Sequence, residues 1–463
     1  MCTCLIAGRK ATASGKAMLA ANDDWDGVPG VLAHELRKVH PLGGMHLLVG
    51  GRTIPEIPET CGYTYTACCY PIGTRKVGWV GGVNDKGVSV AGTGVCAFKE
   101  IPADDAWLEP DDVQILILER AASAREGIRL IGELVAKYGF NFSGLDGCNS
   151  MATYAVADSR EGWFLEMAQG DHWVAERVPD DEAGVRINAF GTHDVDLTDT
   201  ENVMASPGLA EFAKANGWWS GDIHHFDFAA AYGADHSPNE WGPELDPMNM
   251  RRRWRAVSLL SGKDTPEDEP IYSVHPDHAL EPADFMKILR DVYEDTPYDL
   301  RKVPAAGRYG NPFHDDPESY SLCRHATVAS FVADYSLTDS GIMWTAMACP
   351  AMSMYVPLYT DINGLPEYCS EPKPRWDKSS LFWEWRKLGL VLQRRYSLHI
   401  ASTQSMIRMY EDKAVSELKK EAEELAVLSE EERRVRRTEM TGTRLWLSLS
   451  LCRELCCVLL LRY

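Results

Sequence analysis

The sequence lacks the motifs of several large enzyme classes. No GxGxxG follows an expected strand, and GxxxxGK[ST], GxSxG and HExxH do not occur. This argues against a dinucleotide site, a P-loop, a serine nucleophile elbow and a zincin centre. The 13 cysteines form no CxxC pair, so the spacing indicates neither a zinc ribbon nor a dithiol redox motif. We therefore expect no metal and no cofactor.

Positive charge is also scarce. The chain has 47 Lys and Arg against 68 Asp and Glu, a net charge of -21. Such an excess of negative charge repels phosphate backbones and anionic lipid heads, so we expect neither nucleic acid nor a membrane as a partner. The N-terminus has no basic segment followed by an apolar one, which predicts a cytoplasmic protein rather than a secreted one. A homo-oligomer stays open.

The 463 residues, 45% of them hydrophobic, are enough for a large core, and their pattern mixes strands with helices. Helices are predicted within 111–138, where apolar residues recur three or four apart. Short apolar runs bounded by Gly, Asn and Asp predict antiparallel strands. These runs are 3–8, 17–22, 78–83, 88–95, 151–157, 163–168, 172–178, 325–334 and 342–348.

The C-terminal part has a different composition. Residues 396–440 predict a charged amphipathic helix, and 441–463 are rich in Leu and Cys but are interrupted by Arg453 and Glu454. That interruption argues against a membrane span, and an atypical end of the chain is an open hypothesis. We expect a main domain over 1–390, a helical extension over 391–440 and a tail of unassigned role over 441–463.

Cys2 is the most informative single residue. Removal of Met1 would leave a residue that carries both a thiol and a free α-amine, and such an amine titrates near ~7.7–8.0. The thiolate is the nucleophilic form of cysteine, and a neutral amine beside it can take its proton and later return it to a leaving group. A Met-Cys start alone is a weak signal.

Several sequence blocks that follow one another along the chain strengthen the interpretation of Cys2 as a nucleophile. They are MCTCLIAGRKATASGKAMLAANDDWDG, GWVGGVNDKGVSVAGTGV, LILERAASAREGIRLIGELVAKYG, GDHWVAERVPDDEAGVRINAFG, SPGL, MNMRRRWR and RHATVASF through MYVPLY. Together they cover about residues 2–360 and resemble PepD-type dipeptidases, within the N-terminal nucleophile hydrolases that include bile salt hydrolases and penicillin V acylases. The resemblance implies an α+β fold, a four-layer αββα sandwich of two antiparallel sheets.

The resemblance also implies the roles of five residues. Cys2 matches the nucleophile, and Asp24 matches the carboxylate that orients the thiol and the α-amine. Asn84 and Asn188 match amides that stabilise the oxyanion. Arg252 matches the arginine near the catalytic centre, although three consecutive arginines leave the register open by one position.

One position departs from the pattern. Ala21 stands where bile salt hydrolases have an arginine, so the pKa of Cys2 is expected to be depressed less.

The implied activity is cysteine-dependent hydrolysis of dipeptides or short peptides, with a small peptide as the substrate. One alternative is hydrolysis of a non-peptide amide of the bile salt or penicillin type. Another is a non-catalytic, secernin-like interaction protein that keeps the fold and uses its helical tail for binding.

Overall fold

The structure is a computed structural model that describes residues 2–70, 75–142, 151–234, 245–314, 320–371 and 373–462. Its core contains two large antiparallel sheets. The first has seven strands in the order β16-β14-β1-β2-β17-β18-β19. Their bounds are Ser273–Val274, Ala183–Arg186, Thr3–Ala7, Met18–Asp24, Thr327–Asp334, Ile342–Met347 and Val356–Tyr359.

The second sheet has eight strands in the order β15-β13-β12-β11-β10-β9-β8-β3. Their bounds are Val203–Ala205, Trp173–Arg177, Gly162–Met167, Met151–Ala157, Ser89–Val95, Gly78–Asn84, Tyr63–Cys68 and Gly30–Glu35. Two short ribbons, β4–β7 and β5–β6, lie beside it. Their strands are Lys38–Val39, Glu59–Thr60, Met45–Leu47 and Thr53–Pro55.

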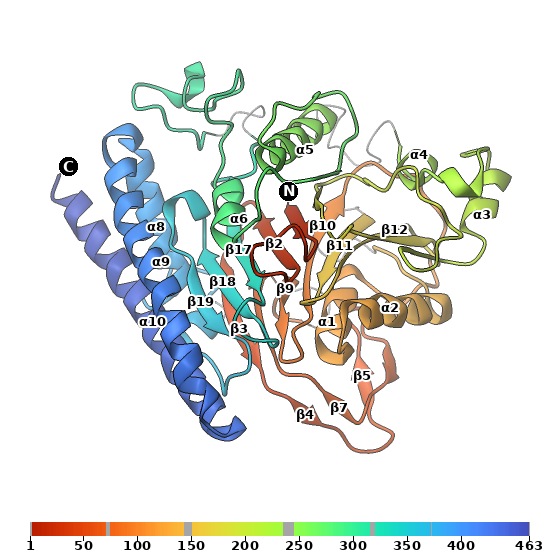
Figure 1. Ribbon diagram of the computed structural model, residues 1–463, viewed down its shortest axis with the longest axis horizontal. Coiled ribbons are helices and arrows are strands. Elements are labelled where there is room, and N and C mark those ends of the chain that lie inside the picture. The colour runs from red at the N-terminus through yellow and green to blue at the C-terminus, as the bar shows by residue number, and fades with distance from the viewer. Residues whose placement is uncertain are drawn as a thin grey trace.

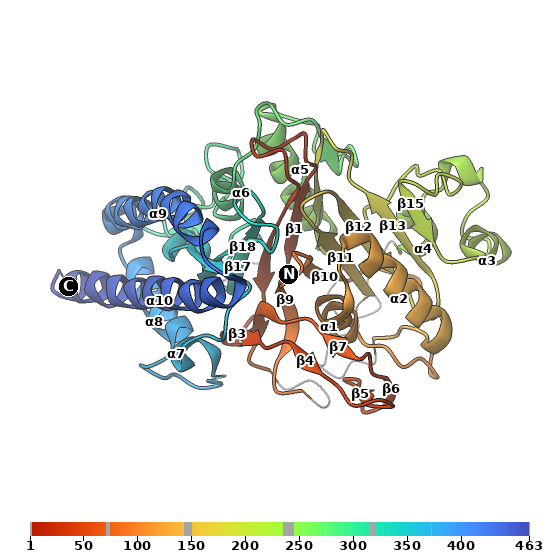
Figure 2. The same ribbon diagram turned by 60° about the horizontal axis from the view of Figure 1, so that its bottom comes forward.

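The two sheets pack face to face between layers of helices (Figures 1 and 2). The inner core contains Cys4, Ile6, Ala155, Phe164 and Phe331, which come from both sheets. Helices α1 (Pro110–Arg120) and α2 (Ala124–Tyr138) cover the eight-stranded sheet, and α5 (Leu245–Ser261) and α6 (Pro282–Leu289) cover the seven-stranded one. This arrangement confirms the predicted α+β sandwich of two antiparallel sheets.

The first two strands form the predicted hairpin at the centre of the seven-stranded sheet. Thr3 pairs with Asn22, and Ala7 pairs with Met18. Strand β1 pairs with β14 on its other side, and β2 pairs with β17. Residue 2 is thus held where the middle of this sheet meets the end of the sandwich, and both figures place the N-terminus there.

Three long helices pack together at one side of the molecule. They are α8 (Leu381–Gln393), α9 (Tyr396–Ala426) and α10 (Glu430–Leu460). Helix α10 begins with a capping box between Ser429 and Glu432, which satisfies free N–H groups of its first turn. It continues through residue 440 without a break, so the Leu- and Cys-rich segment is its second half. The predicted domain limits at 390 and 440 stay predictions.

The Leu- and Cys-rich segment contributes to the core. Its buried side chains recur three or four residues apart, as one face of a helix requires; they are Leu445, Leu449, Cys452, Leu455 and Leu459. This face packs on α8, where Trp385 Nε1 donates to Ser448 Oγ over 3.1 Å. Among the residues that the structure describes, no helix is long and apolar enough to cross a membrane.

The remaining elements are short. They are α3 (Leu209–Ala215), α4 (Phe228–Tyr232), α7 (Glu367–Ser370) and the 3₁₀ turns Ile223–His225, Pro304–Ala306 and Pro350–Met352.

Candidate active site

The sulfur of Cys2 lies against the end of β2. Its thiol donates to Asp23 Oδ1 over 3.5 Å, and the backbone N–H of Asp24 donates to Cys2 Sγ over 3.5 Å. Only 5% of the Cys2 surface is exposed. The hairpin register produces this contact, because residue 2 extends β1 opposite the last residues of β2.

The two consecutive aspartates point to opposite sides of β2, as alternation along a strand requires. Asp24 Oδ1 accepts a hydrogen bond of 2.6 Å from Thr327 Oγ1. Asp23 faces the Cys2 sulfur, and its second oxygen accepts from Cys68 Sγ over 3.6 Å. Asp24 was expected here from the sequence, whereas Asp23 was not. The signal was available, since one of two adjacent strand residues must share the nucleophile's face.

Arg252 joins three parts of the site. Its Nη1 donates to the carbonyl oxygen of Cys2 over 3.0 Å, and its Nη2 donates to Asn188 Oδ1 over 2.8 Å and to Asn249 Oδ1 over 2.5 Å. Asn249 also went unnoticed in the sequence, although it lies one helical turn before Arg252, where the two side chains share a face. The side chain of Arg252 is fully buried.

The structure also settles which of the three consecutive arginines faces the candidate site. Arg251 lies over the ring of Tyr298, 3.7 Å from its centre. Arg253 donates to the carbonyl oxygen of Glu267 over 2.6 Å. Only Arg252 is directed at Cys2, so the position chosen in the sequence is the one that lies there.

Asn188 belongs to the same cluster. It is buried, its Oδ1 accepts from Arg252, and its Nδ2 donates to the carbonyl oxygen of Gly94 over 2.7 Å. A primary amide carries two N–H bonds, so one remains for another acceptor. The structure therefore brings Cys2, Asp24, Asn188 and Arg252 together.

Asn84 is not brought to this cluster. Cys68, which contacts the Cys2 side of the site through Asp23, pairs with Gly78 at the start of β9, whereas Asn84 ends that strand. Six residues of strand separate the two ends by about 20 Å. Asn84 Nδ2 donates to the carbonyls of Leu118 and Ala121, and its Oδ1 accepts from the turn. Its geometry is that of a turn residue that also closes the end of α1, and this does not fit the predicted oxyanion role.

Burial dominates the electrostatics of the cluster. It raises the pKa of the Cys2 thiol to about 12, and the nearby Asp23 and Asp24 act in the same direction. Burial raises the pKa of Asp23 to about 6 and also raises that of Asp24, while it lowers the pKa of Arg252. Ala21, on β2, supplies no cation to the sulfur. A thiol in this environment needs a dedicated base before it can act as a nucleophile.

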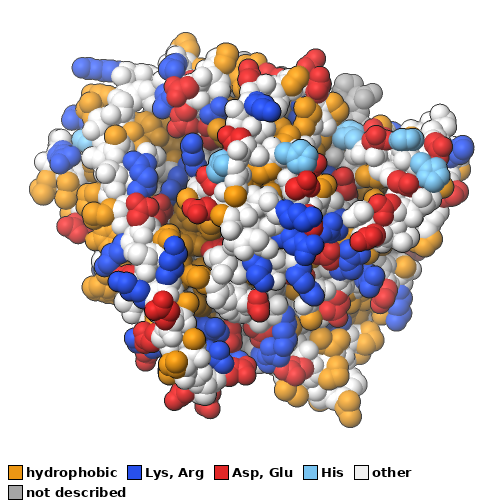
Figure 3. Space-filling model, viewed as in Figure 1, with side chains coloured by type: hydrophobic (Ala, Val, Ile, Leu, Met, Phe, Trp, Pro, Cys, Tyr) orange, Lys and Arg blue, Asp and Glu red, His pale blue; other side chains and the backbone are white. Residues whose placement is uncertain are grey.

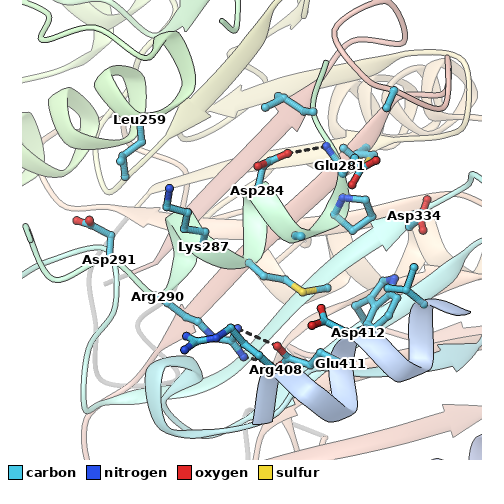
Figure 4. A pocket seen from close by; sticks show the side chains of 18 of the residues that line it. Leu259, Glu281, Asp284, Lys287, Arg290, Asp291, Asp334, Arg408, Glu411 and Asp412 are labelled. Atoms are coloured by element: carbon cyan, nitrogen blue, oxygen red, sulfur yellow. Dashed lines mark hydrogen bonds and ion pairs between the residues drawn. The ribbon is translucent and has the colours of Figure 1, made fainter. Parts of the chain in front are cut away.

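A large cavity lies elsewhere, between α6 and α9, with a volume of about 1120 Å³. Figure 4 shows Arg290, just after α6, reaching Glu411 of α9, and the two form an ion pair of 2.6 Å. Cys2, Asp23 and Arg252 are not among the residues lining it. On the face drawn in Figure 3, acidic and basic side chains are interspersed. The chemistry of the chain points to the Cys2 cluster and not to this cavity.

In the described ranges, no three His, Cys, Asp or Glu side chains are grouped as a metal ion would require.

The chain belongs to peptidase family C69, which matches residues 1–409. This confirms the family that the sequence blocks resemble, and it makes the chain a member of a hydrolase family.

Curated relatives agree over most of their length. A probable dipeptidase from Latilactobacillus sakei is 25% identical over 422 residues, which cover 85% of this chain and 81% of that protein. A dipeptidase from Bifidobacterium longum (strain NCC 2705) is 24% identical over 462 residues, 89% of this chain and 80% of that one. A probable dipeptidase from Salmonella dublin is 27% identical over 375 residues, which cover 77% of this chain and 80% of that protein.

Solved structures are more distant. Penicillin V acylase from Agrobacterium tumefaciens has a TM-score of 0.37 and 12% identity, over 78% of this chain and 86% of that chain. The mutant C2A conjugated bile acid hydrolase from Clostridium perfringens has a TM-score of 0.32 and 9% identity, over 78% of this chain and 90% of that chain. TM-scores this low carry no argument about the site.

Proposed function

We propose that this protein is a dipeptidase in which Cys2, freed by removal of Met1, is the nucleophile. The observation that carries the proposal is the environment of the Cys2 sulfur. Cys2 Sγ lies beside Asp23 and the backbone amide of Asp24, and Arg252 donates to the Cys2 carbonyl oxygen. Membership in peptidase family C69 and the dipeptidase names of the curated relatives support the substrate class.

In the proposed reaction the α-amine of Cys2 takes the thiol proton, and the sulfur attacks the carbonyl carbon of the peptide bond. As the tetrahedral intermediate collapses, the C–N bond breaks and the leaving amine takes that proton. Water then attacks the thioester with the same amine as base, and its hydroxyl joins the released acyl group while the proton returns to sulfur. Apart from the peptide and one water molecule, the reaction uses only groups of Cys2.

The supporting roles follow from the contacts. Asp24 orients the strand end whose N–H meets the sulfur, and Arg252 fixes the Cys2 backbone. Asn188, held by Arg252 and Gly94, offers its remaining N–H to the oxyanion, where one such donor contributes about 3–4 kcal/mol to the transition state. Asn84 is left out of this proposal, because its amide is already bonded at the other end of β9.

The test uses Cys2→Ser, with Cys61→Ser as a control that removes a different free, partly buried thiol. Cys2→Ser should stay folded and lose nearly all hydrolysis of a dipeptide panel, because an alcohol is far less acidic than a thiol. Cys61→Ser should keep its activity. Mass spectrometry of the active protein should find Cys2 as the first residue.

Two results would overturn the proposal. Hydrolysis of dipeptides by Cys2→Ser, or by a chain that still carries Met1, would show that the N-terminal Cys2 is not the nucleophile. A correctly processed, folded chain that cleaves no dipeptide leaves the two alternatives raised from the sequence, hydrolysis of a non-peptide amide and a non-catalytic interaction protein.

A further inference from the structure

Two charged side chains are buried between the sheets, close to the short loop that carries Asn188. Glu166 belongs to β12 and Arg186 to β14, so the two come from different sheets. Phe164, two residues before Glu166, lies in the inner core, and alternation along a strand places Glu166 on the same face. Arg186 Nε donates to Glu166 Oε1 over 2.9 Å, and the two side chains are 2% and 0% exposed. The result is an ion pair that joins the two sheets inside the sandwich.

The carboxylate of Glu166 also accepts two backbone hydrogen bonds from that loop. The N–H of Gly191 donates to Oε1 over 2.7 Å, and the N–H of Thr192 donates to Oε2 over 3.2 Å. Arg186 lies two residues before Asn188, and Gly191 lies three residues after it. One carboxylate therefore holds the chain on both sides of Asn188.

The loop packs directly against the ion pair. A Cβ atom added at Gly191 would lie 2.6 Å from a ring carbon of Tyr272 and 2.9 Å from Cδ of Arg186, well inside the 3.5–4.0 Å of ordinary carbon contacts. Only a glycine lets the backbone pass this close to the arginine. A change in the position of Arg186 or Glu166 must therefore move the loop.

Stability alone does not account for a buried ion pair, because apolar residues of similar volume are often as stabilising. What this pair adds is a fixed geometry on both sides of Asn188. Arg252 and the carbonyl of Gly94 orient the Asn188 side chain, whereas the ends of the loop set where its backbone lies. An oxyanion donor must lie within about 2.7–3.1 Å of the oxygen that it stabilises, so the loop has little freedom to move.

We propose that Glu166 is a positioning residue for the oxyanion donor Asn188. It acts on the reaction through the loop that it holds and not by contact with the substrate. The inference rests on the proposed function, because it takes Asn188 as the group that stabilises the oxyanion.

The first experiment measures Glu166→Gln, which keeps the size of the side chain and removes its charge. The kcat for Ala-Ala should fall by about 10- to 100-fold, because a displacement of about 1 Å is enough for such a loss, and KM should stay within about threefold. The rate at which iodoacetamide alkylates Cys2 should also stay within about threefold, since alkylation forms no oxyanion. Activity is expressed per Cys2 labelled, so that a smaller folded fraction does not count as a loss of kcat.

Three further variants sharpen the comparison. In an Asn188→Ala background, Glu166→Gln should lower kcat by less than about threefold, because two residues that act through one interaction are not additive. Gly191→Ala leaves the ion pair in place but displaces the loop, so it should lower kcat in the same way and carries the test if Glu166→Gln does not fold. The matched control is Glu161→Gln. Glu161 pairs with Arg125 over 2.9 Å at the other end of β12, about 17 Å away along the strand, and its replacement should leave kcat unchanged.

A further 10- to 100-fold loss on top of Asn188→Ala would overturn the inference, because Glu166 would then act independently of Asn188. A kcat within about threefold of the wild type, a change in KM alone, or an equal loss of the Cys2 labelling rate would overturn it as well. An unchanged kcat in Asn188→Ala itself would instead refute the oxyanion role in the proposed function, so the two failures can be told apart.

Discussion

Replacing Arg252 by lysine should damage both stability and activity, although the charge is kept. The guanidinium donates through two separate nitrogens to Cys2 O, Thr3 Oγ1, Asn188 Oδ1 and Asn249 Oδ1. Lysine presents a single nitrogen and cannot occupy both donor positions. At least two buried acceptors lose their partner, and at about 1–3 kcal/mol each the free energy of unfolding should fall by about 2–6 kcal/mol.

The matched control is Arg251→Lys, one residue earlier on the same helix. Arg251 stacks on Tyr298 and is only partly buried, so its replacement should cost about 1 kcal/mol or less. Urea unfolding measures both variants. The kcat/KM for Ala-Ala should fall about 10²-fold in Arg252→Lys, because a small displacement of the Cys2 backbone misaligns the sulfur.

Similar losses of stability in the two lysine variants would contradict this prediction. It also fails if Arg252→Lys keeps a kcat/KM within about threefold of the wild type, because Arg252 would then be unimportant for holding Cys2.

Three other predictions concern different parts of the molecule. Asn188→Ala should lower kcat by about 10²–10³-fold with little change in KM, as expected for an oxyanion donor. Asn84→Ala should instead lower the stability to urea and leave kcat unchanged. A change in KM alone for Asn188→Ala would assign Asn188 to substrate binding. Burial raises the pKa of Glu119 from 4.5 to about 7. Between these two pH values the folded state holds a proton that the unfolded chain releases. The contribution of Glu119 to stability is therefore present at low pH and is lost as the pH rises through this range. Urea midpoints at pH 5 and 8 should differ less in Glu119→Gln, and an unchanged difference contradicts this. Leu445→Ala should cost about 2–5 kcal/mol, while Leu460→Ala, at a position 57% exposed against 1%, should cost about 0.5 kcal/mol or less; equal effects would mean that the second half of α10 does not pack as described.

The local patterns of the chain were enough to predict the central strands. The hairpin of β1 and β2, the pair β9 and β10 and the meander β11–β13 all follow from short apolar runs between Gly, Asn and Asp residues, where register and turn chemistry are local. Strands β3 and β8 went unpredicted. Their pairing with each other has no local turn to indicate it, because β4 to β7 lie between them in the chain. The alternating Tyr and Thr of β8 (YTYTAC) do favour a strand, and this signal was overlooked.

The residues of the candidate site were also predicted only in part. Cys2, Asp24, Asn188 and Arg252 were found through sequence blocks and lie together, because each block also fixes a strand end or a helix face. Asn84 also lies in one of these blocks, but its turn is at the end of β9 away from Cys2, so its oxyanion role stays a prediction that the Asn84→Ala variant tests. Asp23 was missed because an adjacent carboxylate already had a role.

The tail shows a different limit of sequence reasoning. Residues 441–463 have an unusual composition, and composition alone suggested an atypical end. Helical spacing in that segment separates one buried face from an exposed one, and the buried face has meaning only when α8 is in place beside it.

The position of Cys2 in the central hairpin has a consequence for the order of events during biosynthesis. An aminopeptidase must hold the first residues of its substrate extended in its own cleft. Here residue 2 is buried, the next five residues pair with β2, and the last four of those five also pair with β14. Processing of Met1 on the finished fold would require β1 to leave the middle of its sheet. On the proposed mechanism, we therefore expect Met1 to be removed from the nascent chain, before β14, some 180 residues later, has been synthesised and can pair with the first strand.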